Sequence, residues 1–344
     1  MLCLRHLVRC KLVGLCNEST QGPVAARLYT NLALQPKPRA KQVDMSRIMA
    51  GADYMDIEQF RVYPWSISGL ESCILVQKNG LSVAFDMGYA FREAVKCQHV
   101  LISHGHIDHI SGLISHAARR HLCCMRPATY YVPGALIEPL KMVASAYAQM
   151  HANDKINDID LKALGLDDEV NLPGGYIAKP FSTNHRVPSQ GYLLYKQSKQ
   201  LKAEFVGMPS AEINALHKKG VPVHDVLLTP EVAYTGDTNF DVFLNPPNPD
   251  LLRVKLLITE TTYIDDCVDQ NGVTSMTRAR DRGHIHIQEF VDNEHLFRNV
   301  GNLLLVHFSD KYSVGYIHER VYGLLPPSLQ GKVHLGTYLK DKTS

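Results

Sequence analysis

The chain has 344 residues, of which 45% are apolar and 20% are charged, and its formal net charge is +2. This composition excludes a disordered or fibrous chain and suits a folded protein with one large domain or two small ones. No stretch approaches the roughly 18 consecutive apolar residues that cross a bilayer, so we expect no membrane partner.

The first 44 residues differ in composition from the rest of the chain. They contain seven basic residues but only two acidic ones, Glu18 and Asp44. An arginine-rich, acid-poor segment with Ser and Thr is typical of an organelle transit peptide, and Arg27-Leu-Tyr29 resembles a mitochondrial processing site. We therefore expect a mitochondrial protein. The alternatives are a chloroplast presequence, a cytosolic or nuclear form initiated at Met45, and a disordered N-terminus without a targeting role.

Removing this segment changes the charge of the remaining chain. Residues 45–344 contain 29 basic and 32 acidic residues, which gives a net charge of −3. Non-specific binding to nucleic acid is therefore not predicted from the charge, and a polyanion would have to be held by a local basic patch and by metals. The cysteines beyond residue 44 include no Cys-x-x-Cys pair, which favours free thiols in a reducing compartment.

Apolar and β-branched runs predict strands, in chain order, at residues 60–62, 72–78, 82–86, 100–103, 130–132, 192–195, 232–235, 255–259, 302–306 and 333–335. Helical spacing of apolar residues predicts helices at 136–151, 211–219, 285–297 and 313–324. The strands first follow one another through tight turns such as Asn79-Gly80 and later alternate with helices. We therefore predict that residues 45–344 form a single α/β domain, an αββα sandwich of two mixed β-sheets with helices on the outer faces.

The most informative motif follows the predicted strand at residues 100–103. It reads His104-x-His106-x-Asp108-His109 and stands before a predicted helix start near Ile110. Three imidazoles and a carboxylate within six residues are a metal-ligand set, and a turn between strand and helix can aim them at two neighbouring metals. Nitrogen and oxygen ligands of this kind suit zinc, with manganese or iron as alternatives.

Three later motifs follow in the chain, Thr183-Asn-His185-Arg-Val-Pro188, Tyr234-Thr-Gly-Asp237-Thr238 and Leu303-Leu-Leu-Val-His307-Phe-Ser309. Asp237 and His307 come directly after predicted strands, and Gly236 allows the backbone to turn close to a metal. In this order, over residues 58–340, the motifs resemble the metallo-β-lactamase superfamily. Within it they resemble the ribonuclease Z branch, the endonucleases that trim tRNA 3′ ends.

The resemblance implies the sandwich predicted above and a site for two Zn²⁺ ions. One ion would be held by His104, His106 and His185, the other by Asp108, His109 and His307, and Asp237 would bridge them. Without the other motifs, His185 could equally be a histidine in a surface loop. For His307, the alternative is a hydrogen-bonded histidine in the core.

The resemblance also assigns catalytic residues beyond the ligands. His284, in Gly283-His-Ile-His286, matches the family's proton donor, and Glu260 would hydrogen-bond it and fix its tautomer. His286 is the alternative donor, and Asp108 would orient the attacking hydroxide. Asp86 follows a predicted strand, so we expect it to support a ligand histidine, with a turn aspartate as the alternative.

A lysine-rich stretch at residues 196–220 lies where ribonuclease Z carries an arm that grips tRNA. Its helix at 211–219 has Ser210 as a candidate cap and Gly220 at its end. Lys218 and Lys219 are candidate RNA contacts, with a solvated surface helix as the alternative. The resemblance suggests a homodimer in which the arm of one subunit serves the site of the other.

Two segments depart from the family's pattern. Residues 64–70 contain no basic residue where the family has a basic loop that senses the RNA 3′ end, and Thr259-Glu260-Thr261-Thr262 keeps the glutamate of the family's box without its histidine. We predict a dinuclear-metal phosphodiesterase that acts on the 3′ ends of precursor tRNA. The alternative is a small-molecule metallohydrolase, either a thioesterase resembling glyoxalase II or a small phosphodiesterase. A third hypothesis is a non-catalytic RNA-binding scaffold. Such a protein would be recognised by the loss of metal ligands, and this chain keeps all of the predicted ones.

Overall fold

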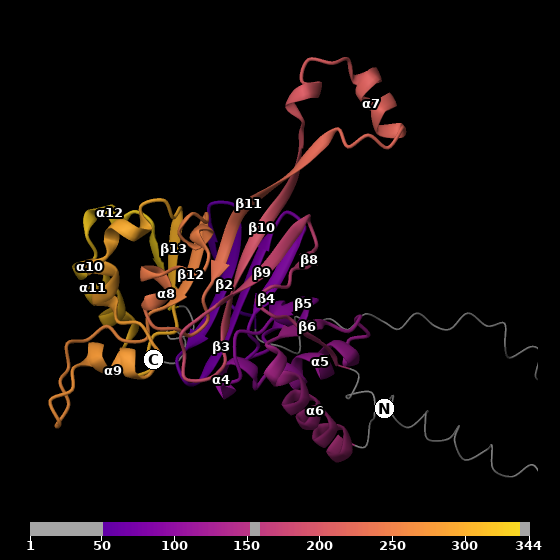
Figure 1. Cartoon of the computed structure of the whole chain (residues 1–344). Helices are drawn as coiled ribbons and strands as arrows, with labels where there is room; N and C mark the ends of the chain where they lie inside the picture. Colours follow the sequence, from indigo (N-terminus) through magenta and orange to yellow (C-terminus); the bar gives the residue numbers. More distant parts are fainter. Residues whose placement is uncertain (1–50, 152–158, 338–344) are drawn as a thin grey trace, which may run out of the picture. The chain divides into compact units, whose positions relative to one another are not determined.

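A computed structural model of the chain describes residues 51–151 and 159–337, all within one unit of the chain, Val43–Ser344. The predicted transit segment and its boundary at residue 44 lie outside the described residues. The described part is built from two seven-stranded sheets, which are drawn at the centre of Figure 1.

The first sheet contains, in spatial order, β1 (Met55–Ile57), β2 (Phe60–Ile67), β3 (Glu71–Lys78), β4 (Leu81–Phe85), β5 (His99–Leu101), β6 (Thr129–Val132) and β7 (Asp160–Ala163). The pairs β1–β2, β2–β3 and β3–β4 are antiparallel, and the pairs β4–β5, β5–β6 and β6–β7 are parallel.

The second sheet contains, in spatial order, β8 (Val170–Leu172), β9 (Tyr176–Ser182), β10 (Gln190–Leu201), β11 (His224–Tyr234), β12 (Leu256–Glu260), β13 (Asn302–Val306) and β14 (Val333–Leu335). Its first four strands are antiparallel and the last four parallel. The two sheets therefore share strand order and directions, so the domain has two halves of like topology that no sequence repeat reveals.

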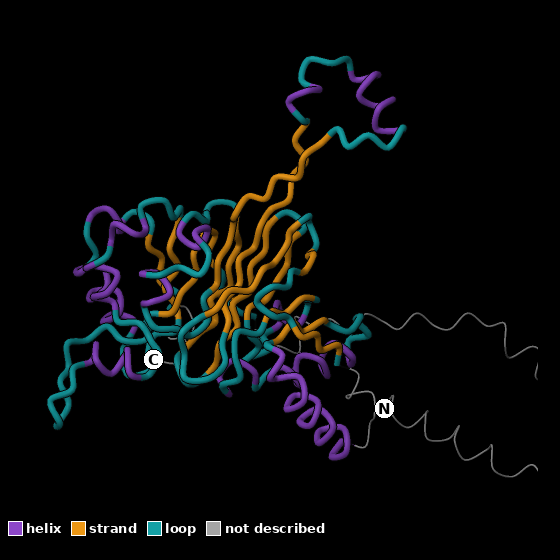
Figure 2. The backbone as a smooth tube through the Cα atoms, viewed as in Figure 1, coloured by secondary structure: helices purple, strands orange, loops and turns teal. Residues whose placement is uncertain are grey.

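Alternate residues of the strands pack on opposite sides of each sheet. In β13, Leu304 and Val306 belong to the core between the sheets, while Leu303 and Leu305 contact the outer helices. The second sheet is covered by α8 (Asp241–Leu244), α10 (Ile287–Asp292), α11 (Val314–Leu324) and α12 (Pro327–Gln330). The first is covered by α3 (Arg92–Val95), α5 (Leu113–Leu122) and α6 (Ile137–His151) (Figures 1 and 2). The predicted αββα sandwich is confirmed. None of the helices in the described ranges has the length and apolar character needed to span a bilayer.

Strands β10 and β11 continue past the rest of their sheet. Strand β9 pairs with β10 only over residues 190–196, whereas the β10–β11 ladder continues to Leu201 opposite His224. Residues 202–223, which we call the arm, connect the two strands and contain α7 (Ser210–Lys218) (Figure 1). Residues 196–201, predicted to belong to the arm, are therefore the end of β10.

Two helix ends differ from their predictions. Ser210 is already helical and caps nothing, because Pro209 occupies the position before the helix, whereas Gly220 ends α7 with φ +80° as expected. The predicted helix at 285–297 is divided into α10 and a 3-10 turn, Glu294–Phe297, since Asn293 leaves helical geometry. His286 caps α10: its Nδ1 accepts the Gln288 N–H, and the Glu289 carboxylate accepts the His286 N–H.

A buried ion-pair network joins the two sheets. Glu231 of β11 is 3% exposed and accepts hydrogen bonds from Lys78 of β3, from Lys255 at 2.7 Å and from the Tyr176 hydroxyl at 2.7 Å. Burial opposes ionisation of Glu231, but the two lysines outweigh it and hold the pKa of this carboxyl below its usual range.

Replacing Glu231 with alanine will leave the nearly buried Lys78 ammonium without its partner. We expect the free energy of unfolding to fall by about 3 kcal/mol, the range for a broken buried pair, as measured by denaturant titration. The exposed pair Lys141–Glu138 is the control, and Lys141→Ala should cost less than about 0.5 kcal/mol. Equal effects of the two substitutions would contradict a structural role for the network.

Candidate metal centre

The residues predicted to bind metal follow the carboxyl ends of strands in both sheets. His104 and His106 follow β5, Asp108 and His109 lie in the short helix α4 (Ile107–Ile110), and His185, Asp237 and His307 follow β9, β11 and β13. Strands β9, β11, β12 and β13 run in one direction, so their carboxyl ends meet at one edge. At this edge the Gln190 N–H donates to the Ser103 carbonyl at 3.0 Å, which joins the two sheets.

Three histidines from distant parts of the chain form the first group of this site. His104 Nε2 lies 3.1 Å from His106 Nδ1, which lies 3.1 Å from His185 Nε2. The Nδ1–H of His185 donates to the Gly283 carbonyl at 2.8 Å. Because the ring proton is on Nδ1, the His185 Nε2 is unprotonated and directs its lone pair toward the other two imidazoles, as a metal ligand must.

Asp108, His109 and His307 form the second group. The Asp108 Oδ2 lies 3.3 Å from His307 Nε2 and 3.4 Å from His109 Nε2. The backbone of the turn after β4 holds α4 closely: a Cβ at Gly88 would lie 1.7 Å from the Asp108 carbonyl oxygen. Only glycine fits at position 88, and this close approach fixes where the Asp108 and His109 side chains begin.

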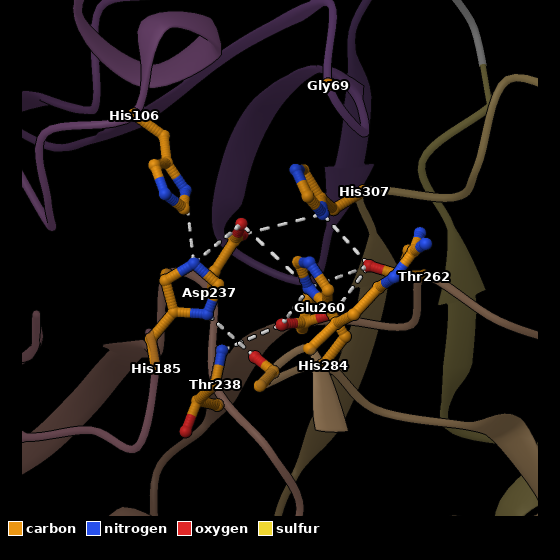
Figure 3. A network of polar contacts seen from close by, with 12 residues as sticks. Gly69, His106, His185, Asp237, Thr238, Glu260, Thr262, His284 and His307 are labelled. Carbon is orange, nitrogen blue, oxygen red and sulfur yellow. Dashed lines mark hydrogen bonds and ion pairs between the residues drawn. The ribbon is translucent and has the colours of Figure 1, made fainter. Parts of the chain in front are cut away.

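Asp237 lies between the two groups, and Figure 3 shows it between His185 of the first group and His307 of the second. Its Oδ2 is 3.4 Å from His109 Nε2 and 3.8 Å from His104 Nε2, and its Oδ1 is 3.5 Å from His307 Nδ1. The structure therefore brings all seven predicted ligands together. Within each group the ligand atoms lie within 4.8 Å of one another, Asp237 counting with His104, His106 and His185.

Asp86 supports the second group through His109. Its Oδ2 accepts hydrogen bonds from His109 Nδ1 at 2.7 Å and from the Tyr234 hydroxyl, while its Oδ1 accepts the Ser103 N–H at 2.7 Å. The side chain is fully buried and the backbone is left-handed, with φ 60°, a strained geometry that persists where packing requires it. The His109 Nδ1 proton is donated to Asp86, and Nε2 faces Asp108 and Asp237. Burial opposes protonation of His109, but the charges of Asp237 and Asp86 outweigh it and hold the pKa of His109 well above its usual range, so positive charge is stabilised here and a metal cation would replace the Nε2 proton.

This arrangement has the chemistry of a cation site. The His109 Nε2 is buried and has no hydrogen-bond partner among the described residues. Burial lowers the pKa of His104 to about 2, and burial together with the neighbouring imidazoles lowers the pKa of His106 and of His185, so these rings are neutral at pH 7. Neutral imidazoles and ionised carboxylates are the forms that bind divalent metals, so the side chains present fit a metal-dependent site.

Beside the predicted ligands, His284 and Glu260 form a buried pair. The His284 Nδ1 lies 3.0 Å from both Glu260 oxygens and 3.9 Å from Asp237 Oδ2. Burial opposes protonation of His284, but the charge and hydrogen bond of Glu260 outweigh it and raise the pKa of His284 to about 9. Glu260 is itself held by the Thr238 N–H at 2.7 Å and the Thr262 hydroxyl at 2.6 Å.

Other residues named from the sequence lie elsewhere. His286 has both ring nitrogens engaged, because Nδ1 accepts the Gln288 N–H and Nε2 donates to the Asp265 carbonyl at 2.8 Å. Lys218 ends α7 and Lys219 follows it, so both belong to the arm. Residues 64–67 of the segment expected to be a loop are part of β2.

Two contacts of the centre were not anticipated from the sequence. The Gly69 N–H donates to Asp108 Oδ2 at 2.9 Å, so the turn after β2 closes over the second group. The Thr262 hydroxyl lies 3.0 Å from His307 Nδ1 and 3.3 Å from His284 Nδ1, which links a ligand to the Glu260 pair. The only sequence signal for the second contact is a threonine, Thr262, two residues after the glutamate that ends a predicted strand. The sequence carries no signal for the Gly69 contact.

Comparisons with known proteins agree with this geometry. No family model matches the chain. The chain is 37% identical to "tRNase Z TRZ1" of Arabidopsis thaliana over 279 residues, which cover 81% of this chain and 95% of that protein. It is 33% identical to "tRNase Z TRZ2, chloroplastic" of Arabidopsis thaliana, over 78% of this chain and 73% of that protein. Among solved structures, the metallo-beta-lactamase fold protein YhfI from Bacillus subtilis matches with a TM-score of 0.51 and 18% identity, over 78% of this chain and 93% of that one. The fold is thus the metallo-β-lactamase fold, and the chain belongs to the tRNase Z, or ribonuclease Z, family of hydrolases.

Proposed function

We propose that this protein is an endoribonuclease that cuts precursor tRNA at the 3′ end of the mature sequence, with two Zn²⁺ ions at its centre. The observation that carries the proposal is the convergence of seven candidate ligand side chains, from four segments of chain, at one edge of the sandwich. The same donors would also accept Mn²⁺ or Fe²⁺. The two Arabidopsis relatives are named tRNase Z, which supports tRNA as the substrate and does not favour a small-molecule hydrolase.

We assign the two ions to the two groups described above. His104, His106 and His185 would hold one, Asp108, His109 and His307 the other, and Asp237 would contact both. Two divalent ions so placed would lower the pKa of bound water and neutralise charge on the phosphoryl oxygens. Asp108 is fixed by Gly69 and His307, and from that position its carboxylate would orient the attacking water.

His284 would donate a proton to the leaving 3′ oxygen of the RNA. Its raised pKa keeps the ring protonated at neutral pH, as a general acid requires. Glu260 accepts the Nδ1 proton, so the opposite nitrogen is the one that can serve the substrate. His286 cannot replace it, since both of its nitrogens are engaged within the protein.

The activity can be tested with three substrates offered to the metal-loaded protein: precursor tRNA with a 3′ trailer, bis-p-nitrophenyl phosphate and S-lactoylglutathione. The proposal expects one cut in the precursor, which leaves a 3′ hydroxyl on the tRNA and a 5′ phosphate on the trailer. Hydrolysis of the thioester alone, with the precursor intact, would contradict it.

We further propose that the active unit is a homodimer in which the arm of one copy serves the centre of the other. Gln190 begins β10 at the edge that carries the centre, and the arm begins after Leu201, eleven residues later. At about 3.3 Å per residue this is roughly 36 Å, too far for Lys218 and Lys219 to contact a phosphate held at their own centre. Both lysines are exposed and would pair with phosphates of RNA bound to the partner.

Mixing two inactive variants will test this dimer. One variant carries Lys218→Glu with Lys219→Glu, and the other carries Asp237→Ala. Each should cleave precursor tRNA poorly alone, but after unfolding and refolding together random pairing should restore about a quarter of the wild-type rate. If the refolded mixture is no more active than the arm variant alone, the arm of one copy does not assist the centre of the other.

For localisation, we propose that residues 1–44 direct the protein to an organelle, the mitochondrion. Their basic, acid-poor composition supports this, and one relative carries the word chloroplastic in its name, so organellar members exist among the relatives. Fluorescent fusions of residues 1–44 and of residues 45–344 will distinguish mitochondrion, chloroplast and cytosol. A cytosolic signal from the first fusion would exclude a targeting role.

A further inference from the structure

An open pocket is formed by the segments that follow β12 and β13. It has a volume of about 450 Å³ and is lined by Asp265, Cys267, Lys311, Tyr312, Ser313 and Tyr316. This volume is within the range of small-ligand pockets, roughly 300–1,000 Å³. None of the six residues has a role in the hydrolytic site described above.

The Tyr263 ring lies close both to the proposed proton donor, His284, and to Lys311, which lines the pocket. The Tyr263 ring lies 6.3 Å from the His284 ring, measured between centroids, and the Lys311 ammonium lies 5.5 Å from the Tyr263 ring centroid. The segments that line the cavity follow β12 and β13, the strands that also deliver Glu260 and His307. The cavity is therefore a continuation of the active-site edge.

The lining combines flat aromatic surface with charge. Tyr316 is 39% exposed, and its ring stacks on Tyr312 with centroids 5.6 Å apart and planes 25° from parallel. Lys311 lies over the Tyr312 ring at 4.8 Å and pairs with Asp265 at 2.5 Å, while 41% of its side chain remains exposed. Arg282 donates to the Tyr263 hydroxyl at 3.1 Å. Aromatic rings beside cations are the surfaces on which unpaired nucleobases stack.

We propose that this cavity binds the base of the RNA nucleotide on the 5′ side of the cut, the one whose 3′ oxygen leaves. The inference rests on the proposed function, because it needs an RNA substrate. That nucleotide carries the oxygen that His284 protonates, so its sugar passes His284 and its base is directed beyond Tyr263. Tyr316 stacks on the base, and Lys311 and Arg282 face the flanking phosphates. By holding the last nucleotide of the mature tRNA, such a pocket would position the RNA strand so that the next phosphodiester bond lies at the metal centre.

The test compares three precursor tRNAs: intact, abasic at the nucleotide 5′ to the cut, and abasic at the nucleotide 3′ to it. Full-length, metal-loaded wild type, Tyr316→Ala and Tyr316→Phe are assayed on each. Tyr322→Ala is the matched control, since Tyr322 lies on the same helix, is 38% exposed and does not line this cavity. Hydrolysis of bis-p-nitrophenyl phosphate, which carries no base, reports on the centre alone.

Loss of one stacked base should raise KM by roughly 5- to 150-fold. Wild type, Tyr316→Phe and Tyr322→Ala should show this penalty on the 5′-abasic precursor only. Tyr316→Ala should show the raised KM on both the intact and the 5′-abasic precursor, so that their ratio falls to about one. Its hydrolysis of bis-p-nitrophenyl phosphate should be unchanged.

Two outcomes would overturn the assignment while leaving the proposed function intact. One is a Tyr316→Ala variant that keeps the wild-type penalty on the 5′-abasic precursor, and the other is a penalty that follows the 3′-abasic position. If wild type hydrolyses bis-p-nitrophenyl phosphate but cleaves no precursor, the proposed function fails, and the base pocket fails with it.

Discussion

Asp237→Ala is expected to abolish hydrolysis and to release metal. Its carboxylate is buried and faces imidazoles of both ligand groups, with oxygen-to-nitrogen distances of 3.8 Å to His104 and 3.4 Å to His109. Although burial opposes ionisation, His307 and His109 hold the pKa of Asp237 well below its usual range, so it is an anion in the folded protein. Without it, two cations would face each other with no shared negative ligand.

We expect the turnover of precursor tRNA by Asp237→Ala to fall by at least about a thousandfold, with fewer than two metal equivalents retained. Cleavage assays and elemental analysis of the same preparation measure both effects. Asp241→Ala is the control, since Asp241 is exposed in the helix that follows and should be replaceable without effect. A variant that keeps both metals and cleaves within tenfold of wild type would remove Asp237 from the centre.

His284→Ala is expected to lower kcat while leaving the metals bound. General acid catalysis contributes about 10²- to 10⁴-fold, so kcat for precursor tRNA should fall within that range. His286→Ala, which removes the cap of α10 and the hydrogen bond to the Asp265 carbonyl, should keep kcat near wild type and cost about 2 kcal/mol of stability. Similar kcat for His284→Ala and wild type would exclude the proton-donor role.

Glu260→Gln tests the same pair through its pH dependence. Burial lowers the pKa of His284 and Glu260 raises it to about 9, so removing the Glu260 charge lowers the pH at which the ring loses its proton. The acid form is the active one, so activity falls as pH rises through this pKa, and the alkaline limb should move to lower pH in the variant. Cations at the neighbouring ligands would lower the value in both proteins by like-charge repulsion, so the difference between them is the measurement. An unmoved alkaline limb would show that His284 does not control it.

Most of the candidate ligands could be predicted from sequence because their motifs come in a recognisable order and several follow apolar strands. His307, for example, comes directly after β13, and β13 has the bounds predicted for it. Parallel pairing of β11, β12 and β13 then places Asp237, Glu260 and His307 at one edge. These features depend on local apolar pattern and on strand direction, both of which the sequence carries.

Other features depend on tertiary contacts and could not be predicted. Strand β9 contains Lys179 and Pro180, which argue against a strand. Its pairing with β8 ends at Ala178, so no carbonyl of β8 needs a hydrogen bond from the backbone of Pro180, which has no N–H to donate. Strand β7 lies at the edge of its sheet and is largely exposed, so it has no apolar run to reveal it. The Gly69 contact with Asp108 joins residues 39 positions apart and leaves no local signal.

Anomalous diffraction from crystals of the zinc-loaded protein tests the central claim most directly, because it locates each metal among named side chains. The account predicts two peaks per chain, one among His104, His106 and His185 and the other among Asp108, His109 and His307, with Asp237 between them. A single peak, or a peak bound outside these seven residues, would contradict it.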